Sequence, residues 1–384
     1  MALSPSARSR TPLRPVRVLA RCVSRCLWYC RCWHGAPCTT CLPGAPCALR
    51  FVCDHDRGDH CVKFSVLQFF SWPGRRVPLQ TVYQRALNRV QIMDQGGYDA
   101  VWLAEHHFST YSVCPSVHIM GMHVAGLTKN IRIGTGVSLA AFYHPLRLAE
   151  EVALLDNLSG GRVNWGAGRG FDRKEMEVFG VGAEDSYDRF RENVEIVLAA
   201  WGSDRLTYRG RHHSFEDVEV LPKPLQDPMP VWIACSSVTA IDWAASQGHS
   251  ILMDPHATHA EIGAKYRHYL AAMEDGGVPN ADRRDIPVAR LLAIAPTDEA
   301  AETVAREGAR WTVDSYANRG PGADDHEARI ERYVRDVIIH GSPARVAAQL
   351  QQLEEEIPLR HLLASILSHE TFVLLTDEVI PRLT

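Results

Sequence analysis

Short apolar runs alternate with amphipathic stretches along most of this chain. The apolar runs have the length of buried strands, and in the stretches between them apolar residues recur every three or four positions, as on one face of a helix. In residues 79–95, Val82, Ala86, Val90 and Met93 share such a face. The predicted strands cover residues 62–68, 98–103, 130–135, 162–166, 230–234, 249–253, 286–295 and 361–367. The predicted helices cover residues 79–95, 115–128, 145–158, 184–201, 238–247 and 259–273, with further helices between 298 and 352.

Strands that alternate with helices in this way predict the α/β class and one parallel sheet. We expect the sheet to close into a (β/α)₈ TIM barrel that forms one domain over residues 62–384. An open, doubly wound sheet also fits the alternation, but no Gly-x-Gly-x-x-Gly motif follows the first strand, and eight strands suit closure. Residues 300–345 are long and partly irregular, so we expect an insertion or lid there, over the barrel mouth.

Residues 1–61 differ sharply from the rest of the chain. The first 60 residues hold nine Arg, no Lys and three acidic residues, together with eight of the eleven Cys. Half of a zinc knuckle at Cys38 and Cys41, a disulfide framework, and an organelle transit peptide each explain part of this composition. None is complete, because no matching cysteine pair follows, nothing downstream looks secreted, and transit peptides are not cysteine-rich. We expect a disordered extension, translated from upstream of the true start.

The composition of the whole chain argues against two broad classes of protein. No apolar run approaches the roughly 20 residues that span a bilayer, so we do not expect an integral membrane protein. The net charge of −4 argues against a general nucleic-acid binder. We therefore expect a cytoplasmic protein that acts on small molecules.

The strand at 98–103 runs directly into Glu105, His106, His107 and Phe108. In a parallel α/β protein the carboxyl end of a strand is where ligands are met, and histidine titrates near neutral pH, so this tip suggests proton transfer. The alternative is a pair of loop histidines held by ordinary hydrogen bonds. Neighbouring residues point in different directions, which weakens a two-histidine metal site, and we predict no metal.

Two further strand ends are suited to an anion. Arg169 lies among glycines after the strand at 162–166, where the backbone allows a ligand to approach closely. Ser236, Ser237 and Thr239 lie where the strand at 230–234 meets a helix, whose first N–H groups can bind phosphate. The alternatives are a glycine turn with a surface arginine and a plain serine N-cap. No base is evident beside Cys235, so we expect it to be a packed small residue.

An aromatic and acidic cluster lies in the irregular region near the C-terminal third of the chain. It consists of Trp311, Asp314, Ser315 and Tyr316. These aromatic rings could stack on a planar ligand, although aromatic side chains more often belong to a core.

Five segments, in this order, resemble the luciferase-like flavin monooxygenases, and within them the bacterial luciferase α-chain group. The segments are 97–108 (GYDAVWLAEHHF), 144–162 (HPLRLAEEVALLDNLSGGR), 168–170 (GRG), 178–180 (VFG) and 232–237 (WIACSS). The similarity covers about residues 62–384, and the combination of motifs is specific.

The resemblance implies a (β/α)₈ barrel that uses reduced FMN and dioxygen to oxidise a small organic substrate. It also implies a separate flavin reductase as the source of reduced FMN, and a homodimer or heterodimer to which helix 145–158 contributes. By position, His106 corresponds to the group's catalytic histidine, and Glu105 or a backbone carbonyl would fix its tautomer.

The resemblance also places the cofactor contacts. Arg169, Ser236 and Thr239 would serve the flavin phosphate, Trp311 would lie near the flavin, and Asp314 would begin a mobile lid. A non-proline cis peptide is expected at the step from Gly136 to Val137. The complete set of implied contacts is Gly136, Val137, Gly168, Arg169, Ser236, Ser237, Thr239 and Trp311.

Two departures from the group's pattern keep the reaction open. Gly168 replaces a reactive cysteine and suggests a different or roomier pocket, and Cys235 replaces a phosphate-side glutamate. Light emission from a long-chain aldehyde is therefore left open as an outcome. A deazaflavin-dependent oxidoreductase and a non-catalytic flavin-binding subunit are the alternative functions.

Overall fold

In the computed structural model, strands that follow one another in the sequence lie side by side in one curled parallel sheet. The structure describes residues 62–315 and 325–383. Within them the sheet has the order β11-β10-β12-β1-β2-β3-β5-β8-β9, with β4 paired to β5. The strands are β1 (Lys63–Gln68), β2 (Ala100–Leu103), β3 (Arg132–Thr135), β4 (Ser138–Leu139), β5 (Val163–Gly168), β8 (Val231–Cys235), β9 (Ser250–Met253), β10 (Val288–Ile294), β11 (Ile339–Gly341) and β12 (His361–Ile366). A separate antiparallel hairpin consists of β6 (Leu206–Arg209) and β7 (Ser214–Val218).

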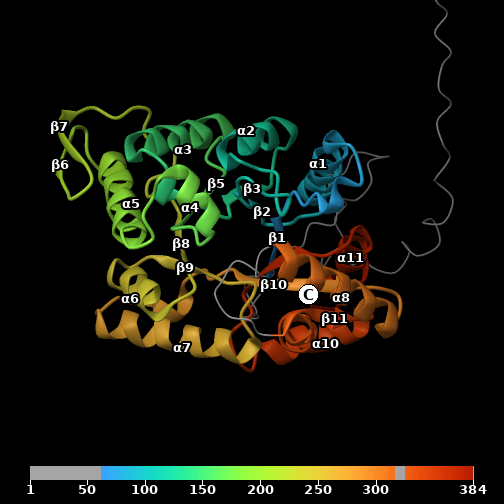
Figure 1. Cartoon of the computed structure of the whole chain (residues 1–384). Helices are drawn as coiled ribbons and strands as arrows, with labels where there is room; N and C mark the ends of the chain where they lie inside the picture. The colour runs from blue at the N-terminus through green and yellow to red at the C-terminus, as the bar shows by residue number, and fades with distance from the viewer. Residues whose placement is uncertain (1–61, 316–324, 384) are drawn as a thin grey trace, which may run out of the picture. The chain divides into compact units, whose positions relative to one another are not determined.

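Helices connect the strands and lie around the sheet (Figure 1). The helices are α1 (Leu79–Gln95), α2 (Val117–Leu127), α3 (Pro145–Ser159), α4 (Arg173–Phe179), α5 (Ser186–Gly202), α6 (Val238–Ser246), α7 (His259–Asp275), α8 (Asp298–Ser315), α9 (His326–Arg332), α10 (Pro343–Leu353), α11 (His369–Leu374) and α12 (Ile380–Leu383). Helix α3 illustrates how the sequence sets their ends. Pro145 occupies its first turn, where the missing N–H costs nothing, and Gly160 ends it with a φ of 74°.

The inner face of the sheet is filled by side chains from six strands. Trp102 of β2 and Trp232 of β8 meet edge to face, with ring centroids 5.2 Å apart. The other members of this inner cluster are Leu67, Ala100, Ala104, Leu252, Ala289 and Leu363. Residues that are far apart in the sheet order therefore touch, which requires the sheet to be strongly curved.

Strand β9, at one end of the strand order, approaches β10, which is next to the other end. The backbone N–H of Met253, at the end of β9, donates to the carbonyl of Pro287, just before β10, at 3.2 Å. The indole N–H of Trp232 donates to the carbonyl of Asp285 at 2.9 Å. The Asp285 carboxylate in turn accepts hydrogen bonds from His361 of β12 and Lys63 of β1, each at 2.8 Å. Asp285 thus links β1, β8 and β12 at the amino edge of the sheet.

The predicted strands are all present, with ends that shift by at most two residues. Two predictions about the C-terminal third need correction or completion. Trp311 to Ser315 are not irregular, because they form the last turns of α8, and β11 in the same region extends the sheet beside β10. Tyr316 and residues 1–61 lie outside the described residues.

All described residues belong to one compact unit. Among them, no helix combines the length and the apolar character that crossing a membrane requires.

Candidate active site

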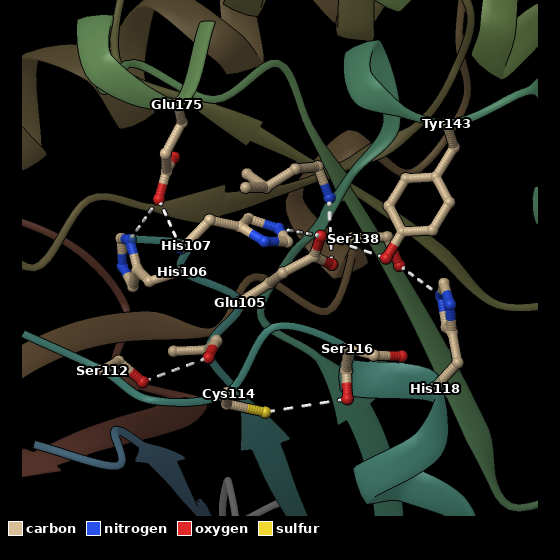
Figure 2. Close-up of polar contacts among 12 residues, drawn as sticks. Glu105, His106, His107, Ser112, Cys114, Ser116, His118, Ser138, Tyr143 and Glu175 are labelled. Carbon is tan, nitrogen blue, oxygen red and sulfur yellow. Dashed lines mark hydrogen bonds and ion pairs between the residues drawn. The ribbon is translucent and has the colours of Figure 1, made fainter. Parts of the chain in front are cut away.

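The tip of β2 presents Glu105, His106 and His107 at the carboxyl edge of the sheet. All four residues of β2 are buried, so polar side chains can follow only beyond its end. Figure 2 shows the two imidazole rings turned in different directions, as the sequence predicts. The ring of His107 extends toward Glu105, whereas the ring of His106 faces Glu175.

Glu105 is held by the protein on all sides and does not reach His106. Its carboxylate is 2% exposed. One oxygen accepts from the Tyr143 hydroxyl at 3.0 Å and lies 3.1 Å from Nε2 of His107, while the other accepts from the Leu139 N–H at 3.4 Å. The expectation that Glu105 fixes the tautomer of His106 is therefore wrong, because its carboxylate is already committed to other partners.

Glu175 of α4 takes the place beside His106. Its Oε1 atom lies 3.4 Å from Nδ1 of His106 and accepts the backbone N–H of His107 at 2.8 Å. The residue is 1% exposed. Glu175 was not predicted from the sequence. It lies three residues after Asp172, which caps the start of α4, and this spacing is a recognisable signal for the start of a helix.

Aromatic rings surround His106 and shield it from solvent. Phe69 stacks on the imidazole at a centroid distance of 6.0 Å, and Tyr111 meets it edge-on at 5.1 Å. Phe171 approaches from the far side at 6.1 Å. The imidazole remains 11% exposed, so it is accessible to a ligand but largely protected from water.

A second histidine that the sequence analysis did not single out faces the same edge from beyond β9. Nδ1 of His256 lies 3.3 Å from the Tyr333 hydroxyl. Burial lowers the pKa of His256, the charge of Asp254 partly opposes this shift, and the charge of Arg290 adds to it. The site therefore contains a second imidazole that is biased toward its neutral form.

Behind Glu105 lies a Ser-His-Glu arrangement. Nε2 of His118 lies 2.9 Å from Oγ of Ser138 (Figure 2), and Nδ1 of His118 lies 3.1 Å from the Glu151 carboxylate. The hydroxyl could resemble an activated nucleophile, but Ser138 is 0% exposed. A buried serine cannot meet a substrate, so this group serves packing.

The step from Gly136 to Val137 is a cis peptide bond, as the resemblance predicts. This segment lies against Gly168, because β4 pairs with the end of β5. A Cβ atom on Gly168 would come within 2.4 Å of the Val137 side chain. Val137 therefore fills the space into which a side chain at position 168 would extend.

Arg169 directly follows β5 and is half-buried. Its guanidinium donates to the Ser186 hydroxyl at 3.1 Å and, within the described residues, makes no ion pair with a carboxylate. Tyr187 follows Ser186, and its hydroxyl donates to the carbonyl of Thr239 at 3.0 Å. Helix α5 therefore contacts Arg169 through Ser186 and the first turn of α6 through Tyr187.

The start of α6 is open to solvent. Ser236, Ser237 and Thr239 are exposed, and the Ser237 hydroxyl accepts the N–H of Ala240 as an N-cap. Ser237 is therefore an N-cap, and the same exposed helix start is also suited to an anion, so the two interpretations of this segment do not exclude each other. Burial raises the pKa of Cys235, which is 2% exposed, so the thiol is the packed residue that the sequence predicts.

These residues suit a phosphate-bearing flavin. The charge of Arg169, the exposed hydroxyls of Ser236 and Thr239 and the helix N-terminus match a phosphate. Gly168 lies at the end of β5 and the Gly136–Val137 step follows β3, and both strands lie between β2 and β8 in the sheet. Across residues 62–315 and 325–383, no group of three or more His, Cys, Asp or Glu side chains could hold a metal ion.

Trp311 lies in the last turns of α8. It lines a cavity of about 600 Å³ together with residues that follow β1 and β2. The predicted contacts therefore fall into two places, with Trp311 apart from Arg169 and the α6 start.

Curated relatives match the chain in part. The oxygenase component of the flavin-dependent trigonelline monooxygenase from Acinetobacter baylyi is 30% identical over 230 residues, which are 59% of this chain and 63% of that protein. An alkanal monooxygenase α chain from the Kryptophanaron alfredi symbiont is 27% identical, over 64% of this chain and 68% of that protein. The chain thus spans less than two thirds of the length of the first of these relatives.

Solved structures share the fold at low sequence identity. A monooxygenase from Streptomyces bottropensis superposes with a TM-score of 0.75 at 23% identity, over 84% of this chain and all of that one. The oxygenating constituent of the 3,6-diketocamphane monooxygenase from Pseudomonas putida, solved with FMN, gives 0.68 at 18% identity, over 84% of this chain and 99% of that one. An F420-dependent secondary alcohol dehydrogenase gives 0.67 at 17% identity with the same coverage.

The model of one family matches most of the described residues. Its description is luciferase-like monooxygenase, and it matches residues 62–359. The match contains β1 to β11 and therefore the tip of β2, the end of β5 and the start of α6. The chain belongs to the luciferase-like monooxygenase family.

Proposed function

We propose that this protein is a flavin-dependent monooxygenase that uses reduced FMN and dioxygen to oxidise a small organic substrate. The observation that carries this proposal is the position of His106. A buried carboxylate holds it at the carboxyl edge of the sheet, where the strand order places it between an anion-suited region and a cavity. Family membership and the flavin-dependent relative from Acinetobacter baylyi support the same reaction class.

The cofactor is held by the ends of β3, β5 and β8. Arg169, Ser236 and Thr239 bind the phosphate, with the backbone of Ser237 at the helix start. Gly136, Val137 and Gly168 lie against the ring system, while Trp311 lines the cavity. When bound, reduced flavin supplies the electrons that activate dioxygen.

His106 moves a proton at Nε2, because its Nδ1 atom faces Glu175. A hydrogen bond from Nδ1–H to the carboxylate fixes that tautomer and leaves Nε2 for the reacting molecule. The rings of Phe69, Tyr111 and Phe171 keep water from this atom. Glu105 orients His107 and Tyr143 and is a positioning residue in this scheme.

The curled sheet closes as an eight-stranded (β/α)₈ barrel through β9 and β10. The hydrogen bond from Met253 to Pro287 and the inner cluster of six strands support closure. The barrel also pairs with a second subunit through α2 and α3. Exposed apolar side chains on these helices support that surface, namely Ile119, Leu154 and Leu158.

A separate reductase delivers the reduced flavin. Support comes from the Acinetobacter baylyi relative, which is named as an oxygenase component. Two alternatives share the fold: an oxidoreductase that uses a deazaflavin, as in the F420-dependent structure, and a subunit that binds flavin without turnover.

Cofactor titration and isotope labelling separate these three functions. The purified protein is titrated with FMN, reduced FMN and F420, and is then supplied with a reductase, NADH, ¹⁸O₂ and candidate substrates. Binding of reduced FMN and ¹⁸O in the product are the expected results. Binding of F420 alone, or FMN binding without oxygen-dependent product, would favour the first or the second alternative respectively.

A further inference from the structure

A cavity of about 600 Å³ opens beside the loop that follows β2. Three segments surround it: the loop after β1, the loop after β2 and the end of α8. Its described lining residues are Trp72, Arg75, Phe108, Ser109, Thr110, Val113, Trp311, Asp314 and Ser315.

The order of the strands places this cavity next to the proton-handling residue. The proposed cofactor contacts lie at the ends of β3, β5 and β8, whereas the cavity lies at the ends of β1 and β2. His106 follows β2, between the two regions, and Phe108 of the lining is two residues further on. A molecule in the cavity would therefore lie beside the loop that carries His106.

The walls of the cavity favour a flat molecule. Trp72, Phe108 and Trp311 contribute three aromatic side chains, and such rings stack on planar ligands. The indole of Trp72 is fixed by a hydrogen bond from Nε1 to the carbonyl of Val77 at 2.7 Å. Phe108 is 57% exposed, and its ring contacts those of His107 and Phe179 at centroid distances of 5.7 and 5.3 Å.

The charge in the cavity favours an anion. The Arg75 guanidinium lies 5.5 Å from the Trp72 ring and has no carboxylate partner among the described residues. The nearest acid of the lining, Asp314, is instead engaged by His326 at 2.7 Å. Arg75 also has a φ of 52°, a left-handed conformation that is uncommon for arginine and often found at ligand sites.

We propose that this cavity binds the substrate, and that the substrate is a planar aromatic carboxylate. The ring would lie against Trp72, Phe108 and Trp311, and the carboxylate would accept paired hydrogen bonds from Arg75. Hydroxyl groups of Ser109, Thr110 and Ser315 complete a polar side for ring substituents. This assignment rests on the proposed monooxygenase function and names its class of substrate.

Calorimetric titration with matched pairs of ligands tests the proposal without turnover. The probes are benzoate, nicotinate and 2-naphthoate, each paired with its neutral amide. We expect at least one acid to bind about tenfold or more tightly than its amide, because a charge-assisted hydrogen bond is lost in the amide. Arg75→Gln should abolish this preference, Arg75→Lys should restore part of it, and Arg76→Gln, at the exposed neighbouring residue, should leave it unchanged.

Three results would overturn the proposal. They are equal binding of acids and amides, no saturable binding of any acid, and an equal loss of preference in the Arg75 and Arg76 variants. A parallel FMN titration of Arg75→Gln should give the wild-type affinity, and weaker FMN binding would instead assign the cavity to the cofactor. A different result would show that the proposed function is wrong: the wild-type protein would still bind an acid more tightly than its amide but would not bind FMN.

Discussion

Nδ1 of His106 lies 3.4 Å from Oε1 of Glu175, although the two residues are 69 positions apart in the chain. The same carboxylate oxygen accepts the backbone N–H of His107. One buried side chain of α4 therefore holds both the ring and the backbone at the tip of β2. This contact is what turns a histidine at a strand end into an oriented proton donor or acceptor.

Replacing Glu175 by Gln tests that orientation. The amide oxygen can still accept the N–H of His107, but the negative charge beside His106 is lost. We expect kcat to fall about tenfold with little change in KM or in FMN affinity. Glu175→Ala should cost more, because the backbone acceptor is lost too. An unchanged kcat in Glu175→Gln would show that the carboxylate serves only to hold the loop.

Arg169 should recognise the phosphate of the flavin. Arg169→Met removes a charge-assisted hydrogen bond, so we expect FMN affinity to fall about 10- to 100-fold. Riboflavin lacks the phosphate, so it should bind more weakly than FMN. Its affinity should be the same for the wild type and for Arg169→Met. Fluorescence quenching of each flavin gives the affinities, with Arg173→Met at an exposed neighbouring position as the control. Equal loss for riboflavin and FMN would contradict the assignment.

The Asp285 carboxylate should make the stability of the sheet depend on pH. Burial works to raise its pKa, but the hydrogen bond and charge of His361, together with Lys63, outweigh burial and lower the pKa from 3.8 to about 2. Because the pKa is lowered on folding, the ionised group stabilises the fold above pH 4, and this contribution is lost as the pH falls toward 2. Asp285→Asn should lower the free energy of unfolding at pH 7 by about 1 to 2 kcal/mol.

Urea unfolding at pH 7 and pH 3 measures this difference. The stability lost by Asp285→Asn should be smaller at pH 3 than at pH 7. Asp217, which is 69% exposed and paired with Arg205, provides the control. Asp217→Asn should have little effect at either pH, because exposed ion pairs contribute little. A loss in Asp285→Asn that does not depend on pH would contradict the account.

Local signals made much of the fold predictable. Helix α1 begins after Pro78 and ends at Gly96, and the prediction of 79–95 matches it because both ends carry strong signals. The β6–β7 hairpin was not predicted, since of its nine strand residues only Leu206 is buried and no apolar run marks it. Strand β4 has two residues, too few for any periodicity.

The site was less predictable, because its contacts join distant segments. The sequence placed His106 at a strand end, but nothing in it indicates that Glu175, not Glu105, lies beside that ring. Likewise, the glycine at position 168 does not indicate that Val137, from the neighbouring strand end, fills the space into which a side chain there would extend. The cis peptide at Gly136 was predicted only because the family resemblance supplied it.

The most direct test of the central claim is ¹⁸O incorporation by His106→Ala. The protein is supplied with reductase, NADH, FMN, ¹⁸O₂ and the preferred carboxylate, and His123→Ala, at an exposed position on α2, is the control. The account predicts labelled product from the wild type and the control, and about 100-fold less from His106→Ala, with FMN affinity unchanged. Wild-type amounts of labelled product from His106→Ala would contradict it.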